Sequence, residues 1–201
     1  MPQHTAKSLF DLNMQSSEEL LRLYDGITTL RTGLEVSWLL RATIVFSISA
    51  FDAYFHDKIK YRAGHFKLPQ LPPALARFEV PLSGLTKWDA AKRKGNAIRN
   101  WITEYYSVIP LQRPDEITKA LKLVGIEKFW PTIEPDDAAR KTLLNELALL
   151  TRRRNQIAHE GDREGARNSG KKLRAITRPE AQACVDFVKN LIGRIETAFP
   201  R

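Results

Sequence analysis

The sequence predicts an all-α protein, built as a bundle of helices. In each long segment apolar residues recur every three or four positions, which is the period of an amphipathic helix. No alternating run of β-branched residues is long enough to demand a sheet. Prolines fall in clusters between the periodic segments, where they separate helices. At 201 residues the chain has the length of one domain, which buries roughly 70% of its unfolded surface without a disulfide or a metal.

The first two helices are predicted from the stretch that precedes the first proline cluster. Ser16-x-x-Glu19 has the pattern of a capping box, so a helix is expected to begin there. From Glu35 to Lys60 the apolar positions step by three or four throughout, and further apolar residues form a second face. A helix with two apolar faces is expected to lie at the centre of the bundle.

The middle of the chain is predicted to be an insertion, at about residues 63–135. Residues 64–85 are rich in proline, and we expect an ordered but irregular segment that lies over the surface. Residues 86–108 are predicted to form one helix, and residues 117–124 a short one that ends at Gly125. The four tryptophans are spread over separate segments and are expected in the core, not on a base-stacking surface.

Two capped helices are predicted to close the chain. Pro135-Asp136-Asp137 is a favourable first turn, with acids at the positive end of the helix dipole, and this helix is expected to end near Gly161. Thr177-Arg178-Pro179-Glu180 begins the last helix with a capping box and an early proline. Between them, residues 161–176 are basic and rich in glycine, which predicts a flexible loop.

The charge of the chain is positive and unevenly distributed. The formal net charge is +9, and the isoelectric point is near 9.8. Between Thr151 and Arg178, nine basic residues are opposed by three acidic ones. Clustered positive charge is typical of proteins that bind nucleic acid or another polyanion. A solvated, solubilising face is the alternative.

Cysteine usage and hydropathy indicate the compartment. The chain has a single cysteine, Cys184, so an intrachain disulfide is excluded and a reducing compartment fits. Residues 1–13 lack the apolar stretch of a signal peptide. No uncharged apolar run reaches the length of about 18 residues that a membrane span needs. We therefore expect a cytoplasmic protein that does not contact a membrane.

The best candidate site is the segment from Arg152 to Asp162, at the end of the helix predicted from residue 135. Gly-rich phosphate loops, Cys or His pairs at metal spacing and nucleophile elbows are absent from the sequence. Continuing the apolar stripe of this helix (Leu143, Leu147, Leu150) by one turn reaches Arg154. An arginine thus lies on a face that should be buried or meet a partner, although an unpaired buried guanidinium costs several kcal/mol.

His159 lies five residues after Arg154, which is about 140° around an ideal helix. The two side chains are therefore expected to share a face only if the helix loosens here, as Gly161 permits. On the long central helix, Arg41, Asp52 and His56 form a polar stripe. The stripe is either an internal network or the outer face, and a structural role is favoured for His56.

Arg154-Asn155-x-x-x-His159 resembles the signature of HEPN domains, in which a polar residue follows an arginine and a histidine comes four to six positions after that arginine. The following Glu160-Gly161-Asp162 is similar to the RiboL-PSP branch of that family, as is Phe51-Asp52-Ala53-Tyr54-Phe55 in the long helix. The resemblance covers roughly residues 17–62 and 136–197. It implies a single HEPN-like helical domain over residues 1–201, with the insertion at about 63–135.

The resemblance implies a bundle that pairs with a second copy through its motif helices. Many members are metal-independent endoribonucleases that need no cofactor, often toxins or antiviral-defence effectors restrained by an antitoxin or another regulatory partner. Arg154 and His159 would be the catalytic pair and Asn155 the supporting polar residue, with Asp52 and His56 as further supporting candidates. Other members are catalytically silent modules that bind a partner protein or nucleic acid, and this is the alternative function.

The chemistry of these residue types fits RNA cleavage without a metal. The reaction needs a base for the 2′-hydroxyl, an acid for the leaving 5′-oxygen, and positive charge beside the phosphate. Histidine can serve as either proton carrier, and arginine binds phosphate oxygens in two places. Two motifs that meet across a two-fold axis would supply two histidines and two arginines. The RNA backbone would be held by the basic residues around the motif: Arg152, Arg153, Arg163, Arg167, Lys171, Lys172 and Arg174.

The RNA-binding and catalytic assignments each have a purely structural alternative. Arg152 and Arg153 can be solvated residues that complement the negative end of the helix dipole, and His159 can do the same.

Overall fold

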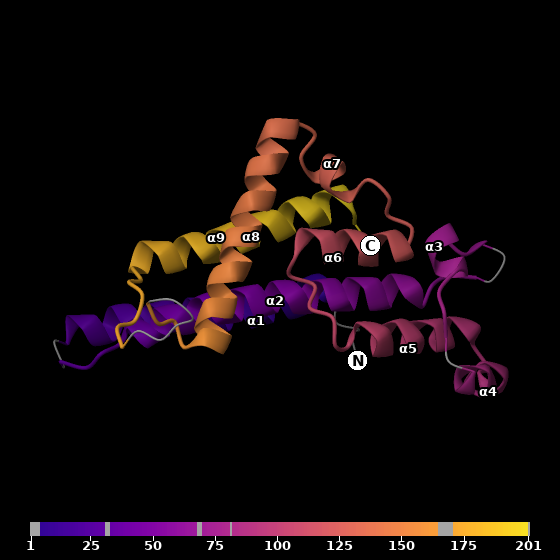
Figure 1. Cartoon of the computed structure of the whole chain (residues 1–201), viewed down its shortest axis with the longest axis horizontal. Coiled ribbons are helices and arrows are strands. Elements are labelled where there is room, and N and C mark those ends of the chain that lie inside the picture. The colour runs from indigo at the N-terminus through magenta and orange to yellow at the C-terminus, as the bar shows by residue number, and fades with distance from the viewer. Residues whose placement is uncertain (1–4, 31–32, 68–69, 81, 165–170, 201) are drawn as a thin grey trace.

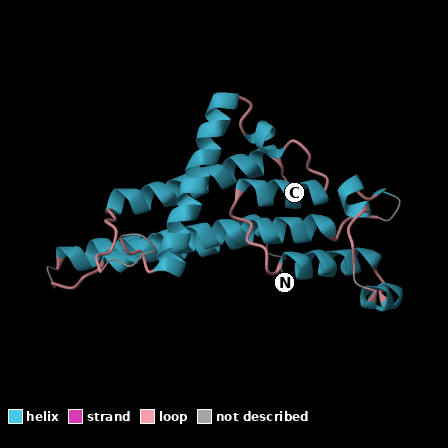
Figure 2. Cartoon of the chain, viewed as in Figure 1, coloured by secondary structure: helices cyan, strands magenta, loops and turns pink. Residues whose placement is uncertain are grey.

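The computed structural model describes residues 5–30, 33–67, 70–80, 82–164 and 171–200, and these residues form nine helices and no strand (Figures 1 and 2). The predicted all-α class is confirmed. The helices are α1 (Ala6–Thr29), α2 (Ser37–Ala63), α3 (Pro73–Ala76), α4 (Ser83–Ala90), α5 (Lys94–Tyr106), α6 (Pro114–Leu123), α7 (Phe129–Ile133), α8 (Asp137–Glu160) and α9 (Arg178–Ala198).

The N-cap of helix α1 is Thr5, eleven residues before the N-cap that the sequence pattern predicted at Ser16. Thr5 caps the helix, since its hydroxyl accepts from the amide of Ser8 while the Ser8 hydroxyl accepts from the amide of Thr5. Phe10 and Met14 then extend the buried stripe toward the N-terminus. Ser16 lies inside α1, because this earlier box and its apolar residues continue the helix through it.

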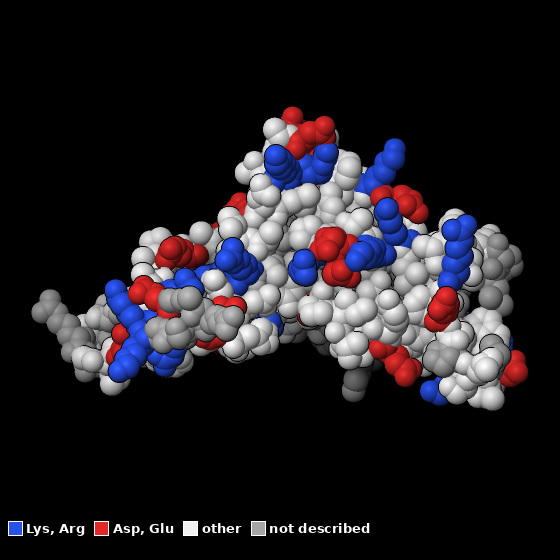
Figure 3. All heavy atoms as spheres, in the orientation of Figure 1, with Lys and Arg blue, Asp and Glu red and all other residues white. Residues whose placement is uncertain are grey.

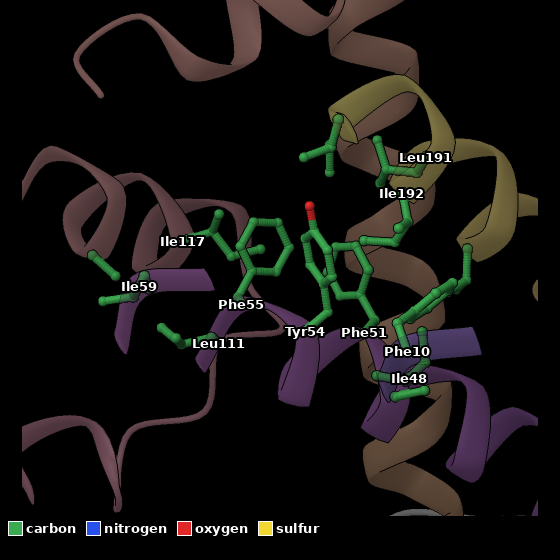
Figure 4. Packing of buried hydrophobic residues seen from close by; sticks show 14 of the residues in the cluster. Phe10, Ile48, Phe51, Tyr54, Phe55, Ile59, Leu111, Ile117, Leu191 and Ile192 are labelled. Carbon is green, nitrogen blue, oxygen red and sulfur yellow. The ribbon is translucent and has the colours of Figure 1, made fainter. Parts of the chain in front are cut away.

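Helix α2 is the central helix, as its two apolar faces predicted. It packs against α1, α5, α8 and α9, and Figure 4 shows Phe51, Tyr54 and Phe55 pointing from α2 into the cluster that these helices share. The Tyr54 hydroxyl donates a hydrogen bond to Glu196 of α9. Among the described helices, α2 alone is long and apolar enough to span a membrane, but most of that stretch is buried in the bundle.

The insertion is more helical than expected. Residues 64–85 contain α3 and the start of α4, and the single helix predicted over residues 86–108 is in fact two, α4 and α5. Extended backbone at Ala91 and Arg93 separates the two helices and lets the chain reverse. The reversal stacks Trp88 on Trp101, with ring centroids 5.3 Å apart, which a continuous helix would not allow.

The short helix predicted over residues 117–124 is confirmed as α6, which begins slightly earlier, at Pro114. Of the four tryptophans, Trp130 is buried and Trp88 and Trp101 are half-buried. The prediction is wrong for Trp38, which is 56% exposed in the first turn of α2, at one end of the bundle.

The last two helices have the boundaries that their capping residues predicted. The Asp136 carboxylate caps α8 by accepting from the amide of Ala139, and Gly161 ends the helix in the left-handed conformation (φ 65°). Thr177 and Glu180 form the expected capping box of α9. The prediction of a flexible loop at 161–176 is wrong for the described residues at its two ends, which pair as an antiparallel bridge between Arg163 and Leu173.

The single cysteine provides a test of how closely α9 packs. Cys184 is fully buried, and burial, together with the nearby Glu146 carboxylate, raises the pKa of its thiol to about 12. Because the thiolate is the reactive species, a disulfide reagent at pH 8 is expected to label the folded protein only as fast as the protein unfolds. Labelling should be immediate in denaturant. Rapid labelling of the native protein would contradict the packing of α9 described above.

Candidate active site

The motif side chains meet at the carboxyl end of α8. Nη1 of Arg154 lies 3.1 Å from Oδ1 of Asn155 and 3.3 Å from Nε2 of His159. Because Nη1 carries two hydrogens, it can donate one to each of these acceptors. In that arrangement Nε2 of His159 is the unprotonated ring nitrogen. His159 is exposed and Arg154 is half-buried, so the imidazole is open to a ligand while the guanidinium is fixed beneath it.

The helix does not loosen between these residues, so the expectation that the two side chains meet only if it loosens is wrong. α8 remains helical through His159 and ends at Glu160, and the amides of Gly161 and Asp162 both donate to the carbonyl of Gln156. The two side chains meet because the arginine side chain is long enough to cross the angular gap. The apolar stripe before it is as predicted, since Leu147 is buried and Leu143 and Leu150 pack against the core.

The guanidinium of Arg154 has unused donor capacity. Its Nε is shielded from solvent and has no hydrogen-bond partner among the described residues. A buried donor left unpaired costs about 1–3 kcal/mol, so the site is incomplete as it stands. The Nε and Nη2 edge of an arginine has the geometry that binds two oxygens of one phosphate.

Asp52 of α2 lies within the electrostatic reach of Arg154. Burial raises the pKa of the Asp52 carboxyl, and the charges of His56 and Arg154 and a hydrogen bond from the amide of Leu111 oppose that rise. The second carboxylate oxygen lies 3.7 Å from Nε2 of His56. The fold thus brings the Asp52 and His56 pair, predicted from a different helix, toward the motif. A carboxyl with a raised pKa retains its proton more readily and is suited to proton transfer.

A buried carboxylate anchors the end of the motif helix. Oδ2 of Asp162 accepts from Nε of Arg41 at 2.6 Å and from Nη2 of Arg153 at 3.0 Å, and Asp162 is 1% exposed. Arg41 also donates to the carbonyl of Arg174 at 2.6 Å. We call Arg41, Arg153 and Asp162 the Asp162 clamp. It joins α2, α8 and the bridge after α8, and so fixes the helix turn that carries Arg154.

A polar cavity of about 890 Å³ lies along the adjacent face of α8. Three arginines line it, Arg113, Arg152 and Arg174, together with the motif residue Asn155. Nε of Arg174, like that of Arg154, is buried without a partner among the described residues. Figure 3 shows Lys and Arg side chains gathered around this end of α8, interspersed with some acidic ones. Asp115 and Glu160 also line the cavity, and Asp115 pairs with Arg113, so the charge of its arginines is partly compensated.

The residues predicted to bind RNA are divided between different environments. Arg152 and Arg174 line the cavity, and Lys171 and Lys172 are exposed beside it. Arg153 is engaged in the Asp162 clamp, and Arg163 donates to the carbonyl of Lys171 at 2.8 Å. The charge of Arg153 is therefore already compensated within the protein. Arg167 lies outside the described residues.

Arg113 and Gln156 line the same cavity but were not singled out from the sequence. Arg113 comes from the turn before α6, far from the motif along the chain, and no local pattern connects the two. Gln156 could have been found from the sequence, because it follows Asn155 within the motif. In the structure it lines the same cavity as Asn155. Within the described part of the chain, no three His, Cys, Asp or Glu side chains are grouped as metal ligands.

One comparison with known proteins returned a match. A family model described as RiboL-PSP-HEPN matches residues 13–200, which includes the motif, the Asp162 clamp and the insertion between α2 and α8. No curated protein and no solved structure matches the chain.

Proposed function

The chain belongs to the RiboL-PSP-HEPN family, and on this basis we propose that it is a metal-independent endoribonuclease. The observation that supports the proposal best is the contact of Arg154 with both His159 and Asn155, beside an unpartnered guanidinium edge. In the proposed reaction the RNA 2′-oxygen attacks the adjacent phosphorus, and a base accepts the proton of the 2′-hydroxyl. The bond from phosphorus to the 5′-oxygen breaks, and an acid protonates that oxygen.

The products are a 2′,3′-cyclic phosphate and a 5′-hydroxyl end. Arg154 stabilises the negative charge that accumulates on the phosphate oxygens. His159 exchanges protons with the substrate oxygens. For His159 to accept a proton, Nη1 of Arg154 must turn from Nε2 toward the phosphate, which the incoming charge favours.

The acid and the base are proposed to come from two protomers. Each chain carries one motif histidine, and a dimer through α8 would place two Arg154–His159 pairs on one axis. The alternative is that each protomer completes its own site with Asp52 or His56. Light scattering is expected to return a dimer mass at high micromolar concentration, and a monomer mass would argue against the shared site.

The substrate is proposed to lie in the cavity beside α8, with its backbone on Arg152 and Arg174. We further propose that the protein is cytoplasmic and acts as a toxin or antiviral-defence effector. Because active members of the family must be kept from cellular RNA, we propose that an antitoxin or another regulatory partner restrains it.

Incubation of the purified protein with single-stranded RNA in EDTA tests the proposal. We expect cleavage without divalent ions, and fragments that carry a cyclic phosphate at one end and a 5′-hydroxyl at the other. A strict requirement for a divalent ion, or 5′-phosphate products, would contradict the mechanism. Binding of RNA without cleavage by protein whose dimeric state is verified would instead favour the silent binding module.

A further inference from the structure

A second cavity, of about 550 Å³, lies between the carboxyl end of α2 and the amino end of α5. Figure 1 shows this end of α2 at the opposite end of the molecule from the turn between α8 and α9. None of the residues that line it belongs to the candidate active site. Its volume is in the range of cavities that bind small ligands.

The cavity is lined by three cations and no acid. Lys67, Arg93 and Arg99 face it, and none of the three has an ion pair or a side-chain hydrogen bond with another described residue. Nε of Arg99 is shielded from solvent and unpartnered among these residues. By contrast, the neighbouring Lys94 is engaged, because its Nζ donates to the carbonyl of Trp88. Three uncompensated cations around one cavity indicate an anionic ligand.

The amino end of α5 adds backbone donors to these cations. Arg93 is the N-cap residue and makes no side-chain capping bond, and the first turn contains no acidic residue. The amide of Asn96 already donates to the carbonyl of Arg93, which leaves the amides of Lys94 and Gly95 as the donors of this helix end. A helix amino end also carries a partial positive charge, which favours phosphate. A Cβ at position 95 would lie only 2.5 Å from the carbonyl oxygen of Gly64, so Gly95 lets the two helix ends approach this closely.

One wall of the cavity is aromatic. The rings of Tyr61 and His65 lie 4.3 Å apart at an angle of 42°, and both residues are exposed. Nδ1 of His65 donates to the carbonyl of Tyr61 at 2.7 Å, which fixes the imidazole against the phenol. An ordered, accessible aromatic surface next to cations is the arrangement on which a nucleobase stacks while its phosphate is bound.

We propose that this cavity binds a nucleotide. The phosphate lies on Arg93, Arg99, Lys67 and the first two amides of α5, and the base stacks on the Tyr61 and His65 rings. The ligand chemistry, a phosphate attached to a nucleoside, is shared by a free nucleotide and by the phosphorylated end of an RNA strand. The proposal does not depend on RNA cleavage, because no residue of the Arg154–His159 site takes part.

Titration calorimetry of the full chain at low salt tests the proposal with five probes. They are AMP, adenosine, inorganic phosphate, and a 2′-O-methyl tetranucleotide in two forms, with and without a 5′-phosphate. The 2′-O-methyl groups prevent cleavage, so the wild-type protein can be used. We expect AMP to bind more tightly than adenosine and more tightly than phosphate. Preference for the 5′-phosphorylated tetranucleotide over AMP would identify an RNA end as the ligand, and the reverse preference a free nucleotide.

Variants assign the binding to this cavity. Arg93→Ala and Lys67→Ala alter exposed side chains and are each expected to weaken AMP binding about tenfold, the value of one charge-assisted hydrogen bond. Tyr61→Ala should weaken AMP binding but leave phosphate binding unchanged. Lys92→Ala removes an exposed cation that does not line the cavity, and it should change nothing. Absence of AMP and tetranucleotide binding at millimolar concentration, or equal effects of Lys92→Ala and Arg93→Ala, would overturn the proposal.

Discussion

Replacing His159 with alanine is expected to lower the rate of RNA cleavage by about 10²–10⁴-fold, the usual contribution of a general acid or base. Arg154→Ala is expected to cost about 10²–10³-fold, because a positioned charge at the reacting phosphate is lost. Both rates are measured with a fluorescent single-stranded RNA in EDTA, under single-turnover conditions. Both variants should retain the helical circular dichroism spectrum, since His159 is exposed and, among the described residues, Arg154 donates only to its motif neighbours.

Lys141→Ala is the matched control, because it removes an exposed cation from the same helix at a distance from the motif. It should leave the cleavage rate unchanged. Wild-type rates in either motif variant would remove Arg154 and His159 from the mechanism.

Mixed dimers then show where the site is assembled. A purified dimer with one wild-type chain and one His159→Ala chain retains half of the activity if each protomer has its own site. A site shared across the axis would lose far more, because every copy lacks one of its two proton carriers. Differently tagged chains and a two-step purification give the mixed species. Half of the wild-type rate would reject the shared site and favour completion by Asp52 or His56.

The second large effect is expected on stability. Asp162→Asn removes the carboxylate that Arg41 and Arg153 share, and it leaves the guanidinium of Arg41, 8% exposed, without its counter-charge. Breaking one partner of a buried ion pair costs about 3–5 kcal/mol. Asparagine suits the test because Asp162 has a positive φ of 54°, which asparagine tolerates better than most residues. The free energy of unfolding is measured by urea denaturation.

Asp115→Asn is the control for charge removal, since Asp115 pairs with Arg113 on the surface. An exposed pair contributes about 0–1 kcal/mol, so this variant should unfold close to the wild-type midpoint. Equal destabilisation by the two substitutions would show that the Asp162 clamp contributes no more than a surface pair.

Most of the fold could be predicted from local patterns. The helical spacing of apolar residues predicted the all-α class and the central position of α2. The capping residues predicted both ends of α8 and the start of α9. The start of α1 was wrong because Ser16-x-x-Glu19 matches a capping box by composition, whereas the actual box, Thr5 and Ser8, uses a serine as its second member. The break between α4 and α5 accompanies the stacking of Trp88 on Trp101, a contact that no local pattern reveals.

The candidate site was predictable where its residues are neighbours in sequence. Arg154, Asn155 and His159 share one helix end, and the structure places them in contact. The role of Asp162 depends on Arg41, which is 121 residues away in the chain and was seen only as part of a polar stripe. Arg113, in the turn before α6, likewise reaches the cavity from a distant part of the chain. Long-range pairs of this kind follow from packing and not from spacing.

The Asp162 clamp is expected to delay the ordering of the motif helix end during synthesis. Its bonds join Arg41 to Asp162 and to the carbonyl of Arg174, across 121 and 133 positions of sequence. Contacts that close such long loops form late, and a chain still emerging from the ribosome folds from its N-terminus. We therefore expect a nascent chain from which Arg174 has not yet emerged to lack the bond from Arg41 to the Arg174 carbonyl that supports the clamp, although residues 154–159 have already been made. On this expectation, the ribosome that makes this protein meets a fully ordered motif only once nearly the whole chain has been translated.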